Sequence, residues 1–244
     1  MYQSRLARSS EYTLQMARLT AGKQGKRKEH QMSLRSGSAI LSGLAFIATT
    51  TVGLGAQDEG VKQVQQLIKK AQSTVESIDT AKLQLKKTVD AYNAMLAPDV
   101  KDRRDSYKQL QKEMANTEKK RAEVTSRAAE MNTEADKLFK SWQDSLASIQ
   151  SPDLRKRSDD RLKKAQDRFT EIRQAGQRAS GLYDPFMKAL QDQVTFLGHD
   201  LNAGAVASLK PDADKLNAQA KELYAAIDKV TAGATANITQ LSAE

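Results

Sequence analysis

The sequence predicts an all-α protein, an elongated antiparallel bundle or coiled coil of about four long helices. Apolar residues recur three and four positions apart through most of residues 57–244, which is the spacing of packed helices. Prolines fall at or near the joints between these stretches, and no sustained alternation of apolar and polar residues predicts strands. Short connections place successive helices antiparallel, so we expect residues 57–244 to form a single helical coiled-coil domain.

Residues 36–57 form a stretch of 22 residues without a charge, directly after Arg35. It contains an apolar run over 39–48 and small residues over 53–56, which together are typical of a secretory signal peptide. We therefore assign residues 32–56 to a cleavable signal that exports a bacterial protein to the periplasm or the medium. The alternative is a retained membrane anchor, but only seven of the 22 residues are Leu, Ile, Val or Phe, so insertion would be marginal.

Residues 1–31 carry seven Lys or Arg and only two Glu. This basic segment is hard to combine with a signal peptide that follows it. Three interpretations stay open: translation starts at Met32 and the segment is not native, the segment is a long basic leader, or it is an arm that touches nucleic acid.

The first helix is expected to run to Leu96, because Pro98 follows it. Ten of its eleven seam positions are apolar, and Lys82 is the exception. The seam comprises positions 61, 64, 68, 71, 75, 78, 82, 85, 89, 92 and 96. The second helix runs from Val100 to Ile149, with a seam that Thr117 and Arg121 interrupt.

Trp142 lies on the seam of the second helix, so we interpret it as a core residue. Ser151 and Pro152 supply a cap and a first-turn proline for the third helix. Gly176 occupies a seam position there, which predicts close approach of a neighbouring helix. Residues 181–185 either kink or end this helix, and the unbroken apolar register favours a kink. A last break at 210–212 precedes a closing, alanine-rich helix to Leu241.

The net charge of +9 is concentrated before the helical domain: residues 1–56 carry +6 and residues 57–244 carry +3. Within the domain, acidic residues precede basic ones by one helical turn, as Glu123 precedes Arg127, which predicts pairing on solvated faces. Asp153, Asp159 and Asp160 stand in the same relation to Arg157, Lys163 and Lys164. We therefore do not expect nucleic acid as a partner of the domain.

Convergent catalytic or metal-binding residues are not apparent in residues 57–244. The chain has no cysteine, and His199 is the only histidine after residue 56. Neighbouring acids such as Asp159 and Asp160 point about 100° apart on a helix, so they do not form an acid and base pair. The sequence thus predicts a protein that is not an enzyme, with no catalytic residue, no metal and no cofactor.

Four segments after about Lys137, residues 138–146, 149–157, 185–192 and 200–209, resemble an uncharacterised bacterial family, domain of unknown function 2959, whose members are exported coiled-coil proteins. The resemblance covers most of the chain after residue 56 and is specific mainly in its second half. It implies export and a helical fold, and it supplies no catalytic residue. Many members carry a lipoprotein cysteine after the signal, whereas this chain has none, so tethering through such a cysteine is not expected.

The function expected from these features is that of a non-enzymatic periplasmic or secreted scaffold that binds a protein partner in the cell envelope or itself. Candidate contact residues are Phe196, His199, Asp200 and Asn202, in the run before the alanine-rich turn, together with the interruption at 117–121. Each segment also has a purely structural explanation that fits equally well: the run before the alanine-rich turn as a helix end, and the interruption at 117–121 as control of the helix register. The main alternative is a membrane-active helical protein that inserts through residues 36–56, and a weaker one is a basic nucleic-acid-binding protein.

Overall fold

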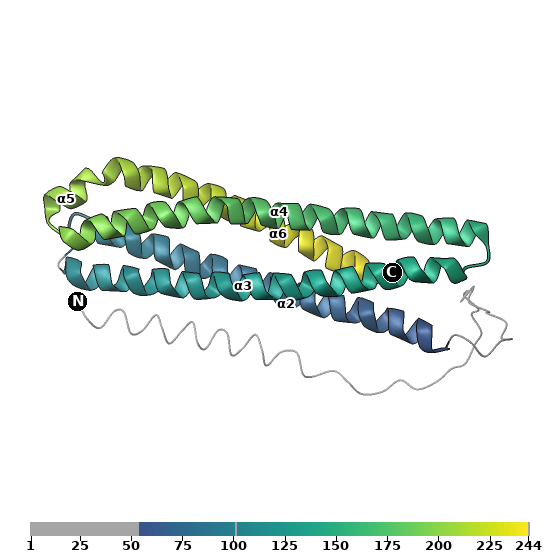
Figure 1. Ribbon diagram of the computed structural model, residues 1–244. Helices are drawn as coiled ribbons and strands as arrows, with labels where there is room; N and C mark the ends of the chain where they lie inside the picture. The colour runs from purple at the N-terminus through teal and green to yellow at the C-terminus, as the bar shows by residue number, and fades with distance from the viewer. Residues whose placement is uncertain (1–53, 101, 244) are drawn as a thin grey trace, which may run out of the picture. The chain divides into compact units, whose positions relative to one another are not determined.

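A computed structural model describes residues 54–100 and 102–243 of the chain (Figure 1). All regular structure in these residues is helical, and four long helices dominate it, as predicted. The elements are α2 (Leu54–Leu96), α3 (Arg103–Ser145), the 3-10 turn η1 (Leu146–Ser148), α4 (Pro152–His199), the short α5 (Ala203–Ser208) and α6 (Lys210–Ala243). The basic leader over 1–31 and nearly all of the signal peptide over 32–56 lie outside the described residues.

The four long helices form a bundle in which each contacts two neighbours. Helix α2 packs on α3 and α6, and α4 packs on the same two helices (Figure 1). Polar contacts show that neighbours are antiparallel, because the partners run in opposite order. Lys70 and Thr88 of α2 contact Glu130 and Thr117 of α3, at 2.7 Å each. Lys82 and Asn93 of α2 contact Asp228 and Asn217 of α6. A helix of 43 residues, such as α2, is about 65 Å long.

The helix ends follow local signals in the sequence. Helix α2 stops at Leu96, two residues before Pro98. The Asp102 carboxylate begins α3 by accepting hydrogen bonds from the backbone N–H groups of the second and third helical residues, at 2.9 and 3.1 Å. Ser151 caps α4 through its hydroxyl, and Pro152 occupies the first helical position. The end of α2 and the start of α4 were predicted, because caps and prolines act within a few residues of their own position. The second helix was expected over 100–149, whereas α3 spans Arg103–Ser145 and the turn η1 follows it. The break expected at 210–212 lies earlier, at residues 200–202 and 209, and Pro211 belongs to the first turn of α6.

Helix α4 continues without interruption through Pro185. Proline lacks a backbone N–H, so the carbonyl of Gly181, four residues earlier, has no intrahelical donor there. The alternative in which residues 181–185 end the third helix is therefore wrong. One helix of 48 residues instead spans the whole bundle from Pro152 to His199.

The buried row of α2 differs from the predicted seam. Val61, the first predicted seam residue, is 57% exposed, whereas Thr74 and Thr88 are buried. Their hydroxyls are satisfied: Thr74 donates to the Lys70 carbonyl at 2.8 Å, and Thr88 bonds the Thr117 hydroxyl of α3 at 2.7 Å. Threonine is compact, and its hydroxyl can be buried between α2 and α3 when it is hydrogen-bonded. A prediction that counts only apolar residues therefore misses these buried positions of α2.

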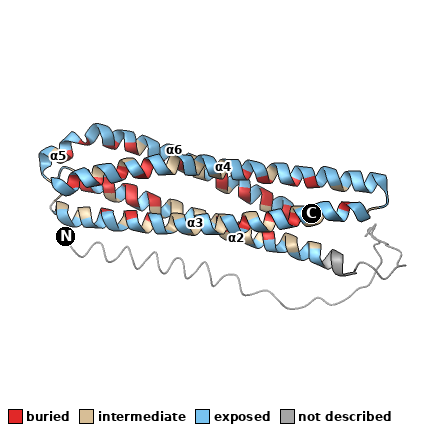
Figure 2. Ribbon diagram, viewed as in Figure 1, coloured by how far each residue is buried: buried red, intermediate tan, exposed pale blue. Residues whose placement is uncertain are grey.

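Buried positions are spread along the helices (Figure 2), and most of the buried residues belong to two core clusters. The larger, which we call the loop-end core, gathers side chains of α2, α3, α4 and α6 beside the α2–α3 connection and α5. The smaller, the hairpin-end core, lies toward the connection between α3 and α4. The loop-end core includes Tyr92, Leu110, Phe186, Leu190 and Leu216, and the hairpin-end core includes Leu67, Met131, Leu138, Phe169 and Leu241.

Trp142 lies near the end of α3 and is only partly buried. Its indole N–H donates to the Ser158 hydroxyl of α4 at 2.9 Å. The last buried residue that α3 contributes to the hairpin-end core is Leu138, one turn earlier, and the partly buried Phe139 packs against it. The prediction that Trp142 is a core residue is therefore wrong: it tethers the first turns of α4 to the end of α3.

Candidate functional site

The predicted contact residues near the end of α4 have different surroundings. Phe196 is 46% exposed, and His199 is the exposed last residue of α4. The Asp200 carboxylate accepts hydrogen bonds from the Asn202 backbone N–H at 3.0 Å and from its side-chain amide at 2.8 Å. Asn202 in turn caps α5 by accepting from the backbone N–H of Ala205 at 2.8 Å. The structure thus brings Asp200 and Asn202 together as a turn, and a partner contact at these four residues stays a prediction.

The interruption of the α3 seam joins α3 to two neighbouring helices. Thr117 bonds Thr88 of α2, while the Arg121 guanidinium lies 2.6 Å from the Asp184 carboxylate of α4. Arg121 also stacks over the Tyr183 ring, with 4.7 Å between the guanidinium carbon and the ring centroid. Thr117 and Arg121, the two residues that interrupt the seam, therefore each contact another helix of the bundle.

Tyr183 completes the contact of α4 with this part of α3. Its hydroxyl donates to the Glu118 carboxylate at 3.0 Å. Burial raises the pKa of Tyr183 well above its ordinary value, and the nearby Glu118 charge raises it further. The phenol therefore stays protonated at neutral pH and acts as a hydrogen-bond donor, not as a base.

Between the two cores, all four long helices lack buried residues at the same level. The unburied segments are residues 78–84 of α2, 118–130 of α3, 173–185 of α4 and 224–229 of α6. A cavity of about 150 Å³ lies at this level, and side chains from all four helices line it. We call it the waist cavity.

Small residues account for the waist cavity. Gly176, Ala179 and Ser180 of α4 line one side, and Ala81 of α2 also contributes to the wall. A Cβ atom added at Gly176 would meet no atom within 4 Å, so no neighbouring helix approaches closely there. The prediction of close approach at Gly176 is therefore wrong. The signal that could have revealed the cavity is the coincidence of small residues on two helices, which requires knowing their register.

Close approach occurs instead at Gly198, in the last turn of α4. A Cβ atom at this position would lie 2.6 Å from the Tyr107 hydroxyl of α3. The same hydroxyl donates to the Val194 carbonyl at 3.2 Å. The absent side chain of Gly198 thus lets Tyr107 bond the backbone of α4.

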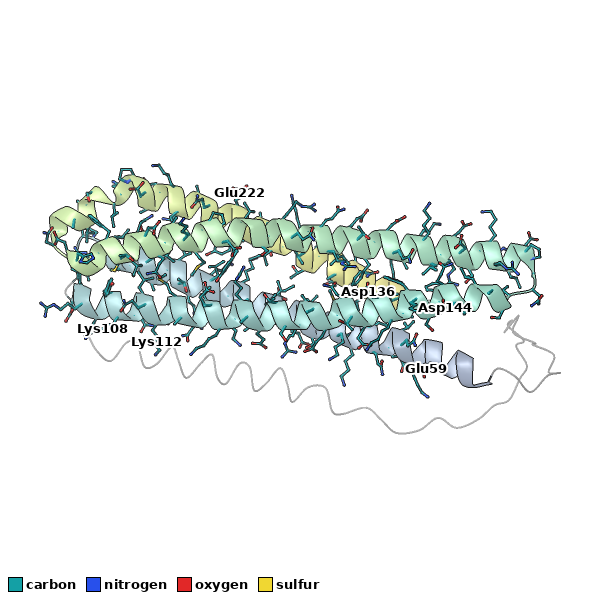
Figure 3. The ribbon with its side chains drawn as sticks, in the orientation of Figure 1. Glu59, Lys108, Lys112, Asp136, Asp144 and Glu222 are labelled. Atoms are coloured by element: carbon teal, nitrogen blue, oxygen red, sulfur yellow. The ribbon has the colours of Figure 1, made fainter. Side chains whose placement is uncertain are left out.

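Charged residues cover the outer faces of the helices, where Lys108 and Lys112 point away from the bundle (Figure 3). The predicted pairing of Glu123 with Arg127 is confirmed, with 3.0 Å between the charged groups. Hydrogen bonds from Lys120 and then Arg127 lower the pKa of Glu123. These pairs support the interpretation of the basic runs as solvated, internally paired faces.

Two structural features bear on the alternative functions. Across residues 54–100 and 102–243, no group of three or more His, Cys, Asp or Glu side chains is placed to hold a metal ion. Within the same part of the chain, none of the helices combines the length and apolar character needed to cross a membrane. Residues 36–53, which belong to the proposed inserting segment, lie outside this range.

The model of the family described as protein of unknown function, DUF2959, matches residues 55–241. The chain belongs to this family. No curated protein and no solved structure is significantly similar to the chain.

The matched span contains almost the whole of α2 and all of α3, α4 and α5, and it ends within the last turn of α6. Both cores and the waist cavity therefore belong to the DUF2959 domain itself. The resemblance to this family is confirmed, and the match includes the first two long helices, where the resemblance is less specific.

Proposed function

We propose that this DUF2959 protein is an exported, non-enzymatic helical scaffold that binds a protein partner in the cell envelope or a second copy of itself. The observation that carries the proposal is the use of its polar groups. Arg121, Tyr183 and Asp184 join α3 to α4, and Lys82 of α2 pairs with Asp228 of α6. These arginine, tyrosine, lysine and aspartate side chains connect helices within the bundle. The charged outer faces are therefore the surface that the domain presents to a partner.

Export is supported by the residues that precede α2. The uncharged stretch over 36–57 has the composition of a secretory signal, and helix formation begins near its end, at Leu54. Sequencing the amino terminus of the protein from its native host tests this part. A start near Gln57 supports export by cleavage, whereas a retained stretch over 36–56 favours the membrane-active alternative and overturns the scaffold proposal as stated.

The partner contact is tested by affinity capture from envelope extracts, with the protein that the native host produces. Phe196→Asp places a charge within the predicted contact run, at a side chain that is 46% exposed. Leu154→Asp is the matched control. Leu154 is also an apolar residue of α4, is 53% exposed, and lies near the opposite end of the helix. Both variants should keep the parent's circular dichroism spectrum and melting temperature.

The expected result is a loss of at least tenfold in the amount of captured partner, or of self-associated protein in sedimentation experiments, for Phe196→Asp alone. Equal behaviour of parent and both variants would remove the contact from the end of α4. Failure of the parent to bind any envelope protein or itself would contradict the scaffold function.

A further inference from the structure

The waist cavity is a partly open space that the proposed scaffold function does not use. It measures about 150 Å³, lies between the two cores and is lined by residues of all four long helices, of which Thr125 and Ser180 are exposed. We propose that it is a binding site for one uncharged apolar molecule, about the size of a single aromatic ring or a short hydrocarbon chain.

The chemistry of the lining points to an apolar ligand. The walls are mainly aliphatic, and two of the polar lining groups are already bonded within the protein: the Thr117 hydroxyl to Thr88, and the Thr125 hydroxyl to the Arg121 carbonyl at 3.0 Å. Among the described residues, no buried polar atom without a partner belongs to the lining. The aliphatic wall includes Ile78, Leu85, Val124, Leu223, Ile227 and Val230.

The size of the cavity suits such a molecule. Apolar cavities of about 150 Å³ in other proteins admit benzene or xenon. The side chains that border an empty space of this size have no contacts on one side, so an apolar occupant restores dispersion contacts that the fold lacks. The small residues at 81, 176 and 179 leave this space where larger residues would close the core.

We place the entrance to the cavity between α3 and α4, because the exposed Thr125 of α3 and Ser180 of α4 line it. Arg121 and Tyr183 line the cavity, and the ion pair of Arg121 with Asp184 links the two helices at this level. The Arg121 side chain is 38% exposed, so it reaches solvent from the wall of the cavity. The pair with Asp184 also balances the arginine charge, which leaves no unpaired cation in the wall to select an anionic ligand.

The test uses toluene as the probe and the melting temperature of the full chain as the readout. At ten times its dissociation constant, a ligand that binds only the folded protein should raise the melting temperature by about 3 to 6 °C for a domain of this size. Two variants fill the cavity from opposite walls, Gly176→Leu on α4 and Ala81→Leu on α2. Gly181→Leu is the matched control, because Gly181 is an exposed glycine of α4 that has open space around it and does not line the cavity.

The proposal requires a saturable toluene-dependent shift in the parent and in Gly181→Leu, and its loss in both cavity-filling variants. Should one filling variant fail to fold, the other decides. In the complex, toluene protons should also show nuclear Overhauser effects to the methyl groups of Val124 and Ile227. Absence of a saturable shift in the parent, or persistence of the full shift in a folded cavity-filling variant, would overturn the proposal.

Discussion

The hydrogen bond of Thr88 with Thr117 offers a sharp test of how α2 and α3 are joined. Both residues are buried, at 0% and 2% exposure, and their hydroxyl oxygens lie 2.7 Å apart. Thr88 has a second acceptor, the Gln84 carbonyl at 3.3 Å. For Thr117, the corresponding acceptor one turn earlier is the Glu113 carbonyl. That carbonyl already accepts a hydrogen bond from the Gln84 side-chain amide at 3.3 Å. The two hydroxyls are therefore not equivalent.

Replacing each threonine by valine removes the hydroxyl and keeps the branched shape. Thr117→Val leaves the Thr88 hydroxyl with its carbonyl acceptor, so we expect a loss of about 0.5 to 1 kcal/mol in the free energy of unfolding. Thr88→Val leaves the Thr117 hydroxyl buried without a partner, which should cost about 1 to 3 kcal/mol. The double variant replaces both polar groups by apolar ones and should be nearly neutral or stabilising.

Urea unfolding of the parent, both single variants and the double variant measures these free energies and their coupling. Thr133→Val is the matched control, because its exposed hydroxyl donates only to the Ala129 carbonyl of its own helix. It should change stability by less than about 0.5 kcal/mol. Equal effects of the two single variants that simply add in the double variant would refute the account of the α2–α3 interface.

Three further outcomes are expected. Phe186→Ala in the loop-end core should lower the free energy of unfolding by about 3 to 5 kcal/mol, whereas Phe196→Ala on the surface should change it by less than about 0.5 kcal/mol in the same urea titration. Gly198→Ala should lower the melting temperature, because its Cβ would lie 2.6 Å from the Tyr107 hydroxyl, and the added variant Tyr107→Phe should restore it; no rescue would contradict the contact. Burial, with the Asp90 charge adding to it, raises the pKa of Tyr224 to about 12, above the value of about 10 in the unfolded chain, so its contribution to stability is complete below pH 10 and is lost as the pH rises toward 12. Tyr224→Phe should therefore lose less stability than the parent over this range, and identical pH profiles would contradict the raised pKa.

The candidate sites differ in how far the sequence could predict them. The run near the end of α4 was chosen as a candidate contact because it precedes the alanine-rich turn. Asp200 and Asn202 form a turn that caps α5, a helix too short for a heptad pattern to reveal. The waist cavity was not predicted, although Gly176 was recognised as a small residue on a seam. A glycine on a seam indicates either close helix approach or an open space, and only the position of the facing residues decides between them.

The sequence by itself determined where α2 ends, where α4 begins and that the long helices form an antiparallel bundle. This was possible because Pro98, Ser151 and Pro152 act on their own turn, and because apolar residues repeat at helical spacing. Only the tertiary structure decided which row of α2 is buried, that Trp142 is outside the core, and that the waist is open. These features depend on the register between residues far apart in the chain, such as Thr88 with Thr117, and on whether each buried hydroxyl finds an acceptor across that register.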